Sequence, residues 1–332
     1  MDDKRWLDGK PRLVRTVVTS QTTYVFLALI IAVIFFATQN VEAFLRPLNI
    51  RNIFKGTAVF MVMATAMTYV IIAKGIDLSV GAVLVFSSVA GVKAVFLLSE
   101  FSIFIQALGG LIAALVAGTC WGIFNGVLIA KLKLPALIVT LGTLGMAQGA
   151  ALLWTGGFNE RGLPLELTDS VGLGRFYGIP YMVLVAAFVA LVGGIVLQGT
   201  RFGQRTYAIG SNEEAAQRAG IPVVRHLIKL YALSGFCAGL AGALSVARFA
   251  TTEIGGHVTD NLQVIAGTVI GGTSLFGGVG SVWGTVIGIH IPTMLRNGFI
   301  IMGVKPFWQQ IAVGGFLILA VYVDQIRRAR LR

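Results

Sequence analysis

The sequence predicts an all-α integral membrane protein, on the evidence of its composition and of the way its apolar residues are grouped. Of the 332 residues, 56% are hydrophobic and 12% are charged, whereas an ordinary soluble domain has roughly 45–50% apolar and about 25% charged residues. The mean hydropathy is +0.84. One membrane-crossing helix needs about 20 apolar residues. The chain therefore has room for about ten crossings in a single transmembrane domain over residues 1–332.

Ten apolar segments, each bounded by charged residues, proline or polar clusters, are the predicted crossings. They lie at 23–39, 53–73, 78–98, 104–130, 134–153, 180–198, 228–247, 262–276, 281–303 and 307–324. The eighth is short, and the ninth contains Pro292. We expect the glycine-rich residues 271–284 to be re-entrant or a broken helix. No small-residue cleavage site follows the first segment, so we predict a retained crossing and not a signal peptide.

The basic residues predict the orientation of these crossings. Most of the 26 Lys and Arg residues fall on one side, and the positive-inside rule makes that side the cytoplasm. Both termini are then cytoplasmic. Residues 1–22 form an N-terminal segment, 199–229 a long hydrophilic loop and 325–332 a basic tail. The net charge of +12 is thus explained by topology and does not favour nucleic acid as a partner.

A weak internal repeat is consistent with two halves. The pattern G-x-x-W-G-x-x-x-G occurs at 118–126 and at 280–288, in crossings predicted to run in opposite directions. Inverted-topology halves, made of crossings one to five and six to ten, would produce this arrangement. A chain with 42 glycines also repeats such spacings by chance, so both explanations remain open.

The motifs of soluble enzymes are absent from the sequence. It contains no phosphate-binding loop, no dinucleotide fingerprint, no nucleophile elbow and no zinc-binding H-E-x-x-H. The three histidines share no metal-ligand spacing. We therefore predict no catalytic residue, no metal site and no cofactor site in this chain, and no ion-coupling group of its own.

The hydrophilic loop at 199–229 contains the signals of a short helix. Ser211 and Glu214 have the spacing of a capping box, and Gly220 provides a left-handed stop just before a proline. A helix of about two turns is unstable alone, so it must pack on something. Ala215 and Ala219 give it a smooth face. That face rests either on the protein's own membrane domain or in a groove of a cytoplasmic partner.

Four motifs, in this order along most of the chain, resemble the permease subunits of ABC importers for ribose and related monosaccharides. They are residues 75–81 (GIDLSVG), 134–143 (LPALIVTLGT), 208–221 (AIGSNEEAAQRAGI) and 271–285 (GGTSLFGGVGSVWGT). The resemblance implies a transporter subunit and not an enzyme, in the cytoplasmic membrane of a prokaryote. It implies that ATP and Mg are bound by separate ATPase subunits, that a second permease copy or a paralogue completes the pore, and that an extracytoplasmic binding protein delivers the sugar.

By the same resemblance, the short helix is the coupling helix that docks on the ATPase. Its predicted contact residues are Ser211, Asn212, Glu213, Glu214, Ala215, Ala216, Ala219 and Gly220. The outer loops at 155–179 and 248–261 are predicted to be polar and solvent-facing, and the resemblance implies that the binding protein docks there.

Polar residues within or beside the predicted crossings are expected to have structural roles or to line the translocation path. Asp77 and Ser79 are expected to cap the third crossing at the cytoplasmic face. Polar side chains in crossings four and five either line the translocation path or make interhelical hydrogen bonds; these are Trp121, Asn125, Thr140, Thr143 and Gln148. Glycines spaced four apart let helices approach closely.

The sequence leaves three alternative functions open. An ABC permease for branched-chain amino acids or nucleosides belongs to a related class. A secondary sugar carrier would use an ion gradient in place of ATP. A membrane-embedded enzyme would need clustered nucleophiles or metal ligands. The sequence names no single sugar and does not distinguish a homodimer from a heterodimer.

Overall fold

A computed structural model describes residues 21–305 apart from 258, together with 308, 309, 311, 312, 314, 315, 318, 322 and 325. The predicted N-terminal segment, the tenth crossing and the basic tail therefore lie wholly or mostly outside the described residues.

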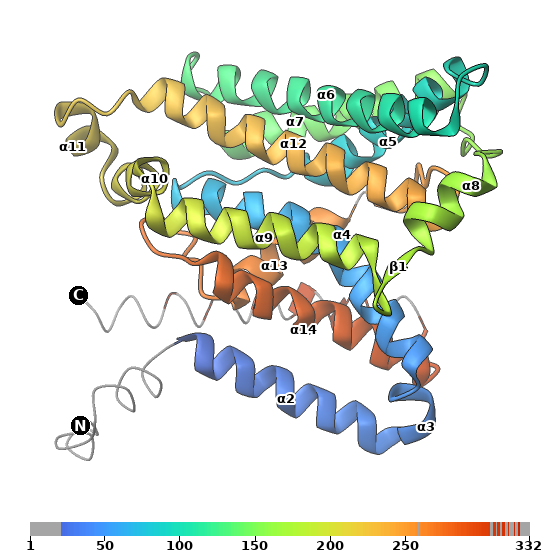
Figure 1. Cartoon of the computed structure of the whole chain (residues 1–332). Coiled ribbons are helices and arrows are strands. Elements are labelled where there is room, and N and C mark those ends of the chain that lie inside the picture. The colour runs from blue at the N-terminus through green and yellow to red at the C-terminus, as the bar shows by residue number, and fades with distance from the viewer. Residues whose placement is uncertain are drawn as a thin grey trace.

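The described chain is a bundle of long helices (Figure 1). The long helices are α2 (Gln21–Gln39), α4 (Pro47–Ile72), α5 (Val80–Leu97), α6 (Ile103–Ala130), α7 (Ala136–Thr155), α9 (Tyr181–Gly199), α12 (Val223–Phe249) and α14 (Val282–Ile301). Short helices connect or extend them: α3 (Val41–Phe44), α8 (Leu165–Leu167), the π-helical turn η2 (Thr168–Gly172), α10 (Arg201–Ser211), α11 (Glu213–Arg218) and α13 (Asp260–Ile270).

A two-stranded antiparallel hairpin precedes α9. It consists of β1 (Arg175–Phe176) and β2 (Ile179–Pro180), with Arg175 opposite Pro180. The hairpin lies at the end of the bundle where α3 and α8 also lie, whereas α10 and α11 project at the opposite end (Figure 1). We call these the β1 end and the α11 end.

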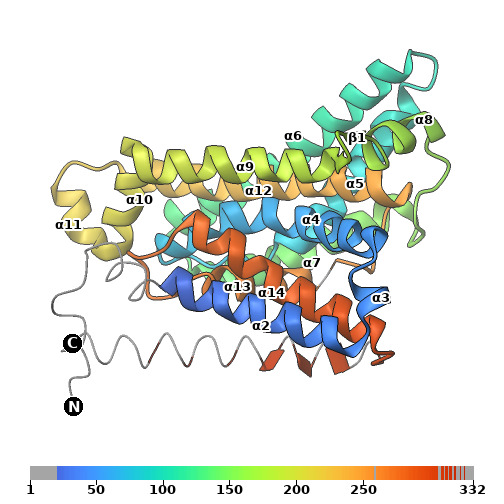
Figure 2. The same ribbon diagram turned by 60° about the horizontal axis from the view of Figure 1, so that its bottom comes forward.

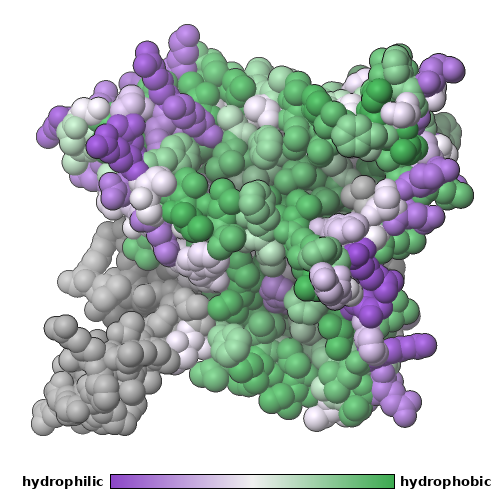
Figure 3. Space-filling model, viewed as in Figure 1, coloured by the Kyte–Doolittle hydropathy of each residue, from purple (hydrophilic) through white to green (hydrophobic). Residues whose placement is uncertain are grey.

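Six of the helices are long and apolar enough to cross a membrane by length and composition: α4, α5, α6, α7, α9 and α12. The helix α2 contains a shorter apolar stretch, Thr23–Gln39, and α14 runs over 20 residues with Pro292 inside it. A hydrophobic band separates hydrophilic residues at the two ends of the bundle (Figure 3). The chain is therefore an all-α, multi-pass membrane protein, and the ten-crossing count remains a prediction.

The helix α4 lies at the centre of the bundle. It packs against α9, α12, α13 and α14, and both views show it between α12 and α14, with α2 beyond α14 (Figure 2). Every residue from 57 to 72 is buried. These residues are uncharged and mostly apolar on all sides of the helix, which is typical of a helix with protein all around it.

Glycines let α6 and α12 pack closely, as predicted. A Cβ on Gly118 would collide with the carbonyl oxygen of Gly235, and one on Gly122 with that of Tyr231. In the second copy of the pattern, a Cβ on Gly288 would collide with the carbonyl oxygen of Gly267 on α13. The two copies thus face different partners, and inverted halves remain a prediction.

The region of the predicted eighth crossing is broken. The helix α13 has 11 residues, about 16 Å at 1.5 Å per residue, which is half of the roughly 30 Å hydrocarbon core. Residues 262–276 therefore do not form one continuous membrane-spanning helix, and a crossing there remains a prediction. The glycine-rich residues 271–281 form the break between α13 and α14, in agreement with the predicted broken helix. A re-entrant stretch that was not predicted consists of residues 250–257, which leave the end of α12 and return into the bundle to reach Gly81.

Candidate coupling site

The hydrophilic loop at 199–229 contains a helix that was not predicted, α10. Thr200 caps its start, because its side-chain oxygen accepts a hydrogen bond from the backbone N–H of Gly203. Its buried residues, Gly203, Thr206, Ile209 and Gly210, recur at helical spacing. The Oγ1 of Thr206 lies 2.9 Å from Nε2 of His226 on α12. The capping threonine and this periodicity are the sequence signals that could have revealed α10.

The end of α10 is fixed against the end of the central helix α4. A Cβ on Gly210 would collide with the carbonyl oxygen of Ile72, so only glycine allows this approach. Two residues beyond α4, Lys74 Nζ donates a hydrogen bond of 3.2 Å to the carbonyl oxygen of Ser211. The chain that leads into α11 is thus held directly by the chain that leaves α4.

The glycine-rich residues 271–281 stabilise the same contact between α10 and the end of α4. The backbone N–H of Gly278 donates to the carbonyl oxygen of Ile72 at 2.8 Å, and Tyr207 Oη donates to the carbonyl oxygen of Gly280 at 2.7 Å. Gly277 and Gly278 both have positive φ, at 80° and 74°, which explains glycine at these positions. This segment joins α10 to the half-helix α13.

The short helix α11 begins one residue later than predicted. Asn212 has extended backbone angles, and its Oδ1 accepts a hydrogen bond of 3.0 Å from the backbone N–H of Ala215. Ser211 is the last residue of α10, so the prediction of Ser211 as the cap was wrong. Both residue types cap helices well, and the length of α10 decides between them. Glu213 and Glu214 occupy the first turn, where negative charge is favourable.

The end of α11 is as predicted. Gly220 has a φ of 80°, and the backbone N–H of Ile221 donates to the carbonyl oxygen of Ala216 at 3.1 Å. This left-handed stop turns the chain directly into α12, which begins at Val223. Helices α10, α11 and α12 are therefore separated by only a few residues.

Only one side of α11 packs on the membrane domain. Ala216 is 5% exposed and belongs to a small apolar cluster with Ile209 and Val223. Ala215 and Ala219 are exposed, so the predicted alanine face does not rest on the rest of the chain in the described residues. The ion pair of Glu214 with Arg218, at 3.5 Å, is fully solvated and contributes little.

A groove of about 1170 Å³ opens beside α11. It lies among the adjoining ends of α4, α6, α7 and α12, and polar and charged side chains line much of its mouth. The groove reaches inward to Gly75 and to Tyr231. These residues adjoin a buried polar network, which we call the Asp77 network.

The Asp77 network ties the segment between α4 and α5 to two further helices. Asp77 is 2% exposed. Its Oδ1 accepts hydrogen bonds from the backbone N–H and the Oγ of Ser79, at 3.0 and 2.6 Å. Its Oδ2 accepts one from Ser234 Oγ of α12 at 2.7 Å. Asn125 Nδ2 of α6 donates to Ser79 Oγ at 2.9 Å.

The predicted capping role of Asp77 and Ser79 needs correction. Ser79 is at the N-cap position of α5, but its side chain makes no capping hydrogen bond to that helix. Its hydroxyl is engaged by Asp77 and Asn125 instead. The two residues therefore join α5 to α6 and α12, and do not cap a free helix end.

The five predicted path residues are not gathered around one cavity. Trp121 packs edge-on against Phe86, with ring centroids 5.8 Å apart. The other four make hydrogen bonds: Asn125 within the Asp77 network, Thr140 to the carbonyl oxygens of Ile76 and Ala136, Thr143 to that of Thr140 and Gln148 to that of Ile254. Gln148 also lines a pocket of about 690 Å³ at the β1 end. Hydrogen bonding within the chain thus accounts for most of this set.

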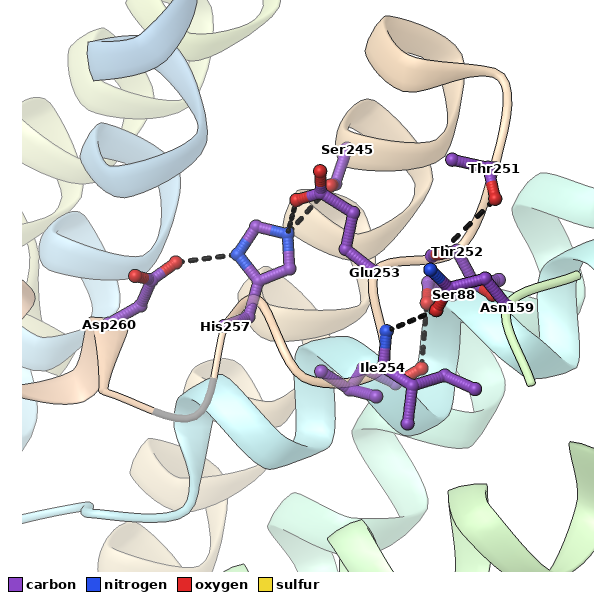
Figure 4. A network of polar contacts seen from close by, with 10 residues as sticks. Ser88, Asn159, Ser245, Thr251, Thr252, Glu253, Ile254, His257 and Asp260 are labelled. Carbon is purple, nitrogen blue, oxygen red and sulfur yellow. Dashed lines mark hydrogen bonds and ion pairs between the residues drawn. The ribbon is translucent and has the colours of Figure 1, made fainter. Parts of the chain in front are cut away.

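The re-entrant residues 250–257 are held by a second polar network (Figure 4). His257 is hydrogen-bonded to Asp260 through Nδ1, and its Nε2 lies 2.8 Å from Ser245 Oγ and 3.4 Å from Glu253. Asn159 Oδ1 accepts a hydrogen bond of 2.9 Å from the backbone N–H of Ile254. The prediction that 248–261 is a solvent-facing loop was therefore wrong for its inner part.

The re-entrant segment also contacts the start of α5, deep in the bundle. Asn261 Nδ2 donates to the carbonyl oxygen of Leu78 at 2.9 Å, and a Cβ on Gly81 would collide with the carbonyl oxygen of His257. Residues 73–79 enter from the α11 end and 250–257 from the β1 end, so two broken crossings meet here. Such interruptions are typical of transporters.

Comparison with known proteins finds that the chain matches one family. The family described as "Branched-chain amino acid transport system / permease component" matches residues 49–321. The ribose import permease protein of Bacillus subtilis (strain 168) is 39% identical over 309 residues, 92% of each chain. That of Escherichia coli (strain K12) is 34% identical over 324 residues, 96% of this chain and 97% of the relative.

A third relative is named for another sugar. The xylose transport system permease protein of Escherichia coli (strain K12) is 32% identical, and 92% of each chain is covered. None of the solved structures matches this chain. The family match covers most of the chain, and the relatives match it over nearly their full length. The chain therefore belongs to the permease family that includes the ribose import permeases.

Proposed function

We propose that this chain is the membrane-spanning permease subunit of an ABC importer that takes up a ribose-like monosaccharide. The observation that carries the proposal is α11, a capped helix whose Ala215 and Ala219 face is open while Gly210 and Lys74 fix its base to α4. A helix of six residues with one unsupported face needs a partner surface. The sugars in the names of the relatives support the substrate class.

The proposed partners follow from the same arrangement. Two ATPase subunits, which bind ATP and Mg, dock at the α11 end, and an extracytoplasmic binding protein delivers the sugar at the β1 end. A second copy of this chain, or a paralogue, completes the translocation path. The assembly lies in the cytoplasmic membrane of a prokaryote.

The contacts around α11 support a mechanism for coupling. Closure of the ATPase would displace α11, and α10 would carry that movement to Ile72 and Lys74 through contacts that leave no free space at Gly210. Residues 73–79 lead from there to Asp77, which holds α5, α6 and α12 together. ATP can shift such an equilibrium only if the partner contacts differ between the two states.

A permease for branched-chain amino acids is the second candidate, because the family description names that substrate. The relatives at 32–39% identity are named for sugars, so we favour a sugar.

Uptake in proteoliposomes tests the proposed function. The chain is reconstituted with its partner ATPase and its binding protein, and entry of radiolabelled ribose is measured. We expect uptake to require ATP on the side of the membrane where the ATPase subunits lie. We also expect it to stay unchanged when proton and sodium gradients are collapsed. A matched preparation receives labelled leucine. Gradient-driven uptake without ATP would refute an ABC permease, and ATP-driven uptake of leucine in place of sugars would refute the substrate class.

A further inference from the structure

Five basic residues from four elements gather near the β1 end of the bundle. Arg51 and Lys55 lie on α4, Arg175 on β1, Arg248 in the last turn of α12 and Arg296 on α14. Arg51 lies one helical turn before Lys55 on α4, and a Cβ on the next residue, Gly56, would lie 3.4 Å from the Arg248 guanidinium. Gly172, which contacts both Lys55 and the backbone of Arg248, precedes Arg175 by three residues, and the charge of Arg296 acts on Arg248. We call these five residues the basic cluster.

The cluster is partly withdrawn from water. Lys55 is 8% exposed, and its Nζ donates a hydrogen bond of 2.9 Å to the carbonyl oxygen of Gly172. Arg248 is half-buried, with its guanidinium carbon 4.8 Å from the ring centroid of Phe249. A carbonyl oxygen and an aromatic ring solvate these cations in part but do not neutralise them.

No carboxylate of the described residues forms an ion pair with any member of the basic cluster. Glu253 attracts Arg248, but it contacts His257 instead. By contrast, Lys93, at the same end of the bundle, pairs with Glu160 at 2.6 Å. Withdrawn charges are costly without a counter-charge. Lys55 and Arg248 are therefore withdrawn charges without a paired counter-charge, and the exposed Arg175 and Arg296 add positive charge beside them.

The chemistry and the position of the cluster define the anion that it would bind. Arginine guanidinium groups match the oxygens of a phosphate in pairs, and four of the five residues are arginines. The 26 residues of α4 span about 39 Å at 1.5 Å per residue, which exceeds the roughly 30 Å hydrocarbon core. Lys55 lies eight residues, or about 12 Å, after the start of this helix, so its level is compatible with the edge of the core. Phe54, Phe176 and Tyr177 beside the cluster are exposed, and tyrosine is enriched at that interface. Hydrophilic residues near β1 adjoin the hydrophobic band on this face (Figure 3).

We propose that the basic cluster is a binding site for a phosphate oxyanion, carried by the headgroup of an anionic phospholipid such as phosphatidylglycerol. Such a lipid would link α4, α12, α14 and the β1 hairpin through one headgroup. The inference does not depend on the transported substrate. Free phosphate is the other source of the same chemistry.

The test measures lipid binding to the purified full chain in detergent, by native mass spectrometry, with phosphatidylglycerol, phosphatidylcholine and inorganic phosphate as separate probes. The variants are Arg51→Gln and Arg248→Gln. The matched control is Arg161→Gln, an exposed arginine at the β1 end. One basic residue contributes about 1 kcal/mol to anionic-lipid binding, or about fivefold. We expect each cluster variant to weaken phosphatidylglycerol binding about fivefold, and the control to leave it unchanged.

Each outcome decides the proposal. Phosphatidylglycerol binding that exceeds phosphatidylcholine binding and falls in the cluster variants supports the lipid headgroup. Inorganic phosphate that competes with the lipid, or binds alone with the same dependence on the variants, supports the same site with free phosphate as its source. Equal binding of the two lipids, or equal binding by the wild type and the cluster variants, overturns it. If one variant fails to fold, Arg175→Gln on the exposed hairpin replaces it.

Discussion

Replacement of Gly210 by valine is expected to abolish ATP-coupled uptake, with a loss greater than about tenfold. A side chain at this position collides with the backbone of Ile72, so α10 must move away from the end of α4. Since overpacking a tight contact costs about 1–3 kcal/mol or more, α10 and α11 would adopt a position in which the ATPase no longer moves α4. Uptake and ATP hydrolysis are measured together in the reconstituted complex.

A matched variant separates lost coupling from lost folding. Gly199, at the end of α9, has nothing within 4 Å of a Cβ, so Gly199→Val makes the same chemical change without a collision. We expect it to transport at nearly the wild-type rate. We expect Gly210→Val complexes still to assemble and to hydrolyse ATP. Wild-type uptake by Gly210→Val would show that this contact does not transmit the movement.

Replacement of Asp77 by alanine is the second change with a large expected effect. It leaves Ser79 and Ser234 without their acceptor inside the bundle, and each buried donor left unpaired costs about 1–3 kcal/mol. It also removes the link that holds residues 73–79 to α12. We expect a lower unfolding temperature for the purified chain and a loss of uptake greater than about tenfold.

Two further variants make the Asp77 result specific. Asp169→Ala removes an exposed carboxylate at the β1 end and should change neither quantity. Ser234→Ala removes one of the three hydrogen bonds to Asp77 and should have an intermediate effect on both. An Asp77→Ala protein with wild-type stability and uptake would contradict the role that we give to the network.

Local signals in the sequence predicted the end of α11 but not its beginning. A left-handed glycine followed closely by a proline is a local signal for the end of a helix, and Gly220, with a φ of 80°, ends α11. Ser211 and Asn212 are both good caps, and the choice between them depends on how far α10 continues. Packing against Ile72 and His226 sets that limit, and no local pattern contains this information.

The re-entrant segment could not be predicted from hydropathy. Residues 250–257 are polar and have no helical period, as in a solvated loop. Their partners lie far away in the sequence: Asn159 holds Ile254, and Gln148 donates to the same residue. A buried polar segment is stable only when such partners exist. The shortness of the eighth apolar segment was visible in the sequence, but the re-entrant chain before α13 was not.

The polar residues of crossings four and five illustrate the same limit. Their placement inside a helix bundle was predictable because polar groups avoid lipid. Whether these side chains face a translocation path or each other depends on how each helix is rotated about its own axis. Asn125 and Thr140 turn out to bond with residues 76–79.

The central claim is that the open face of α11 docks on the ATPase, and site-specific photocrosslinking tests it most directly. A photoreactive amino acid is placed at position 215, on the exposed face of α11, and separately at position 181, an exposed position at the opposite end of the bundle. After irradiation of the assembled importer, we expect a covalent adduct between position 215 and the ATPase subunit, and none from position 181. The absence of an ATPase adduct from position 215 in a complex that transports sugar would contradict the claim.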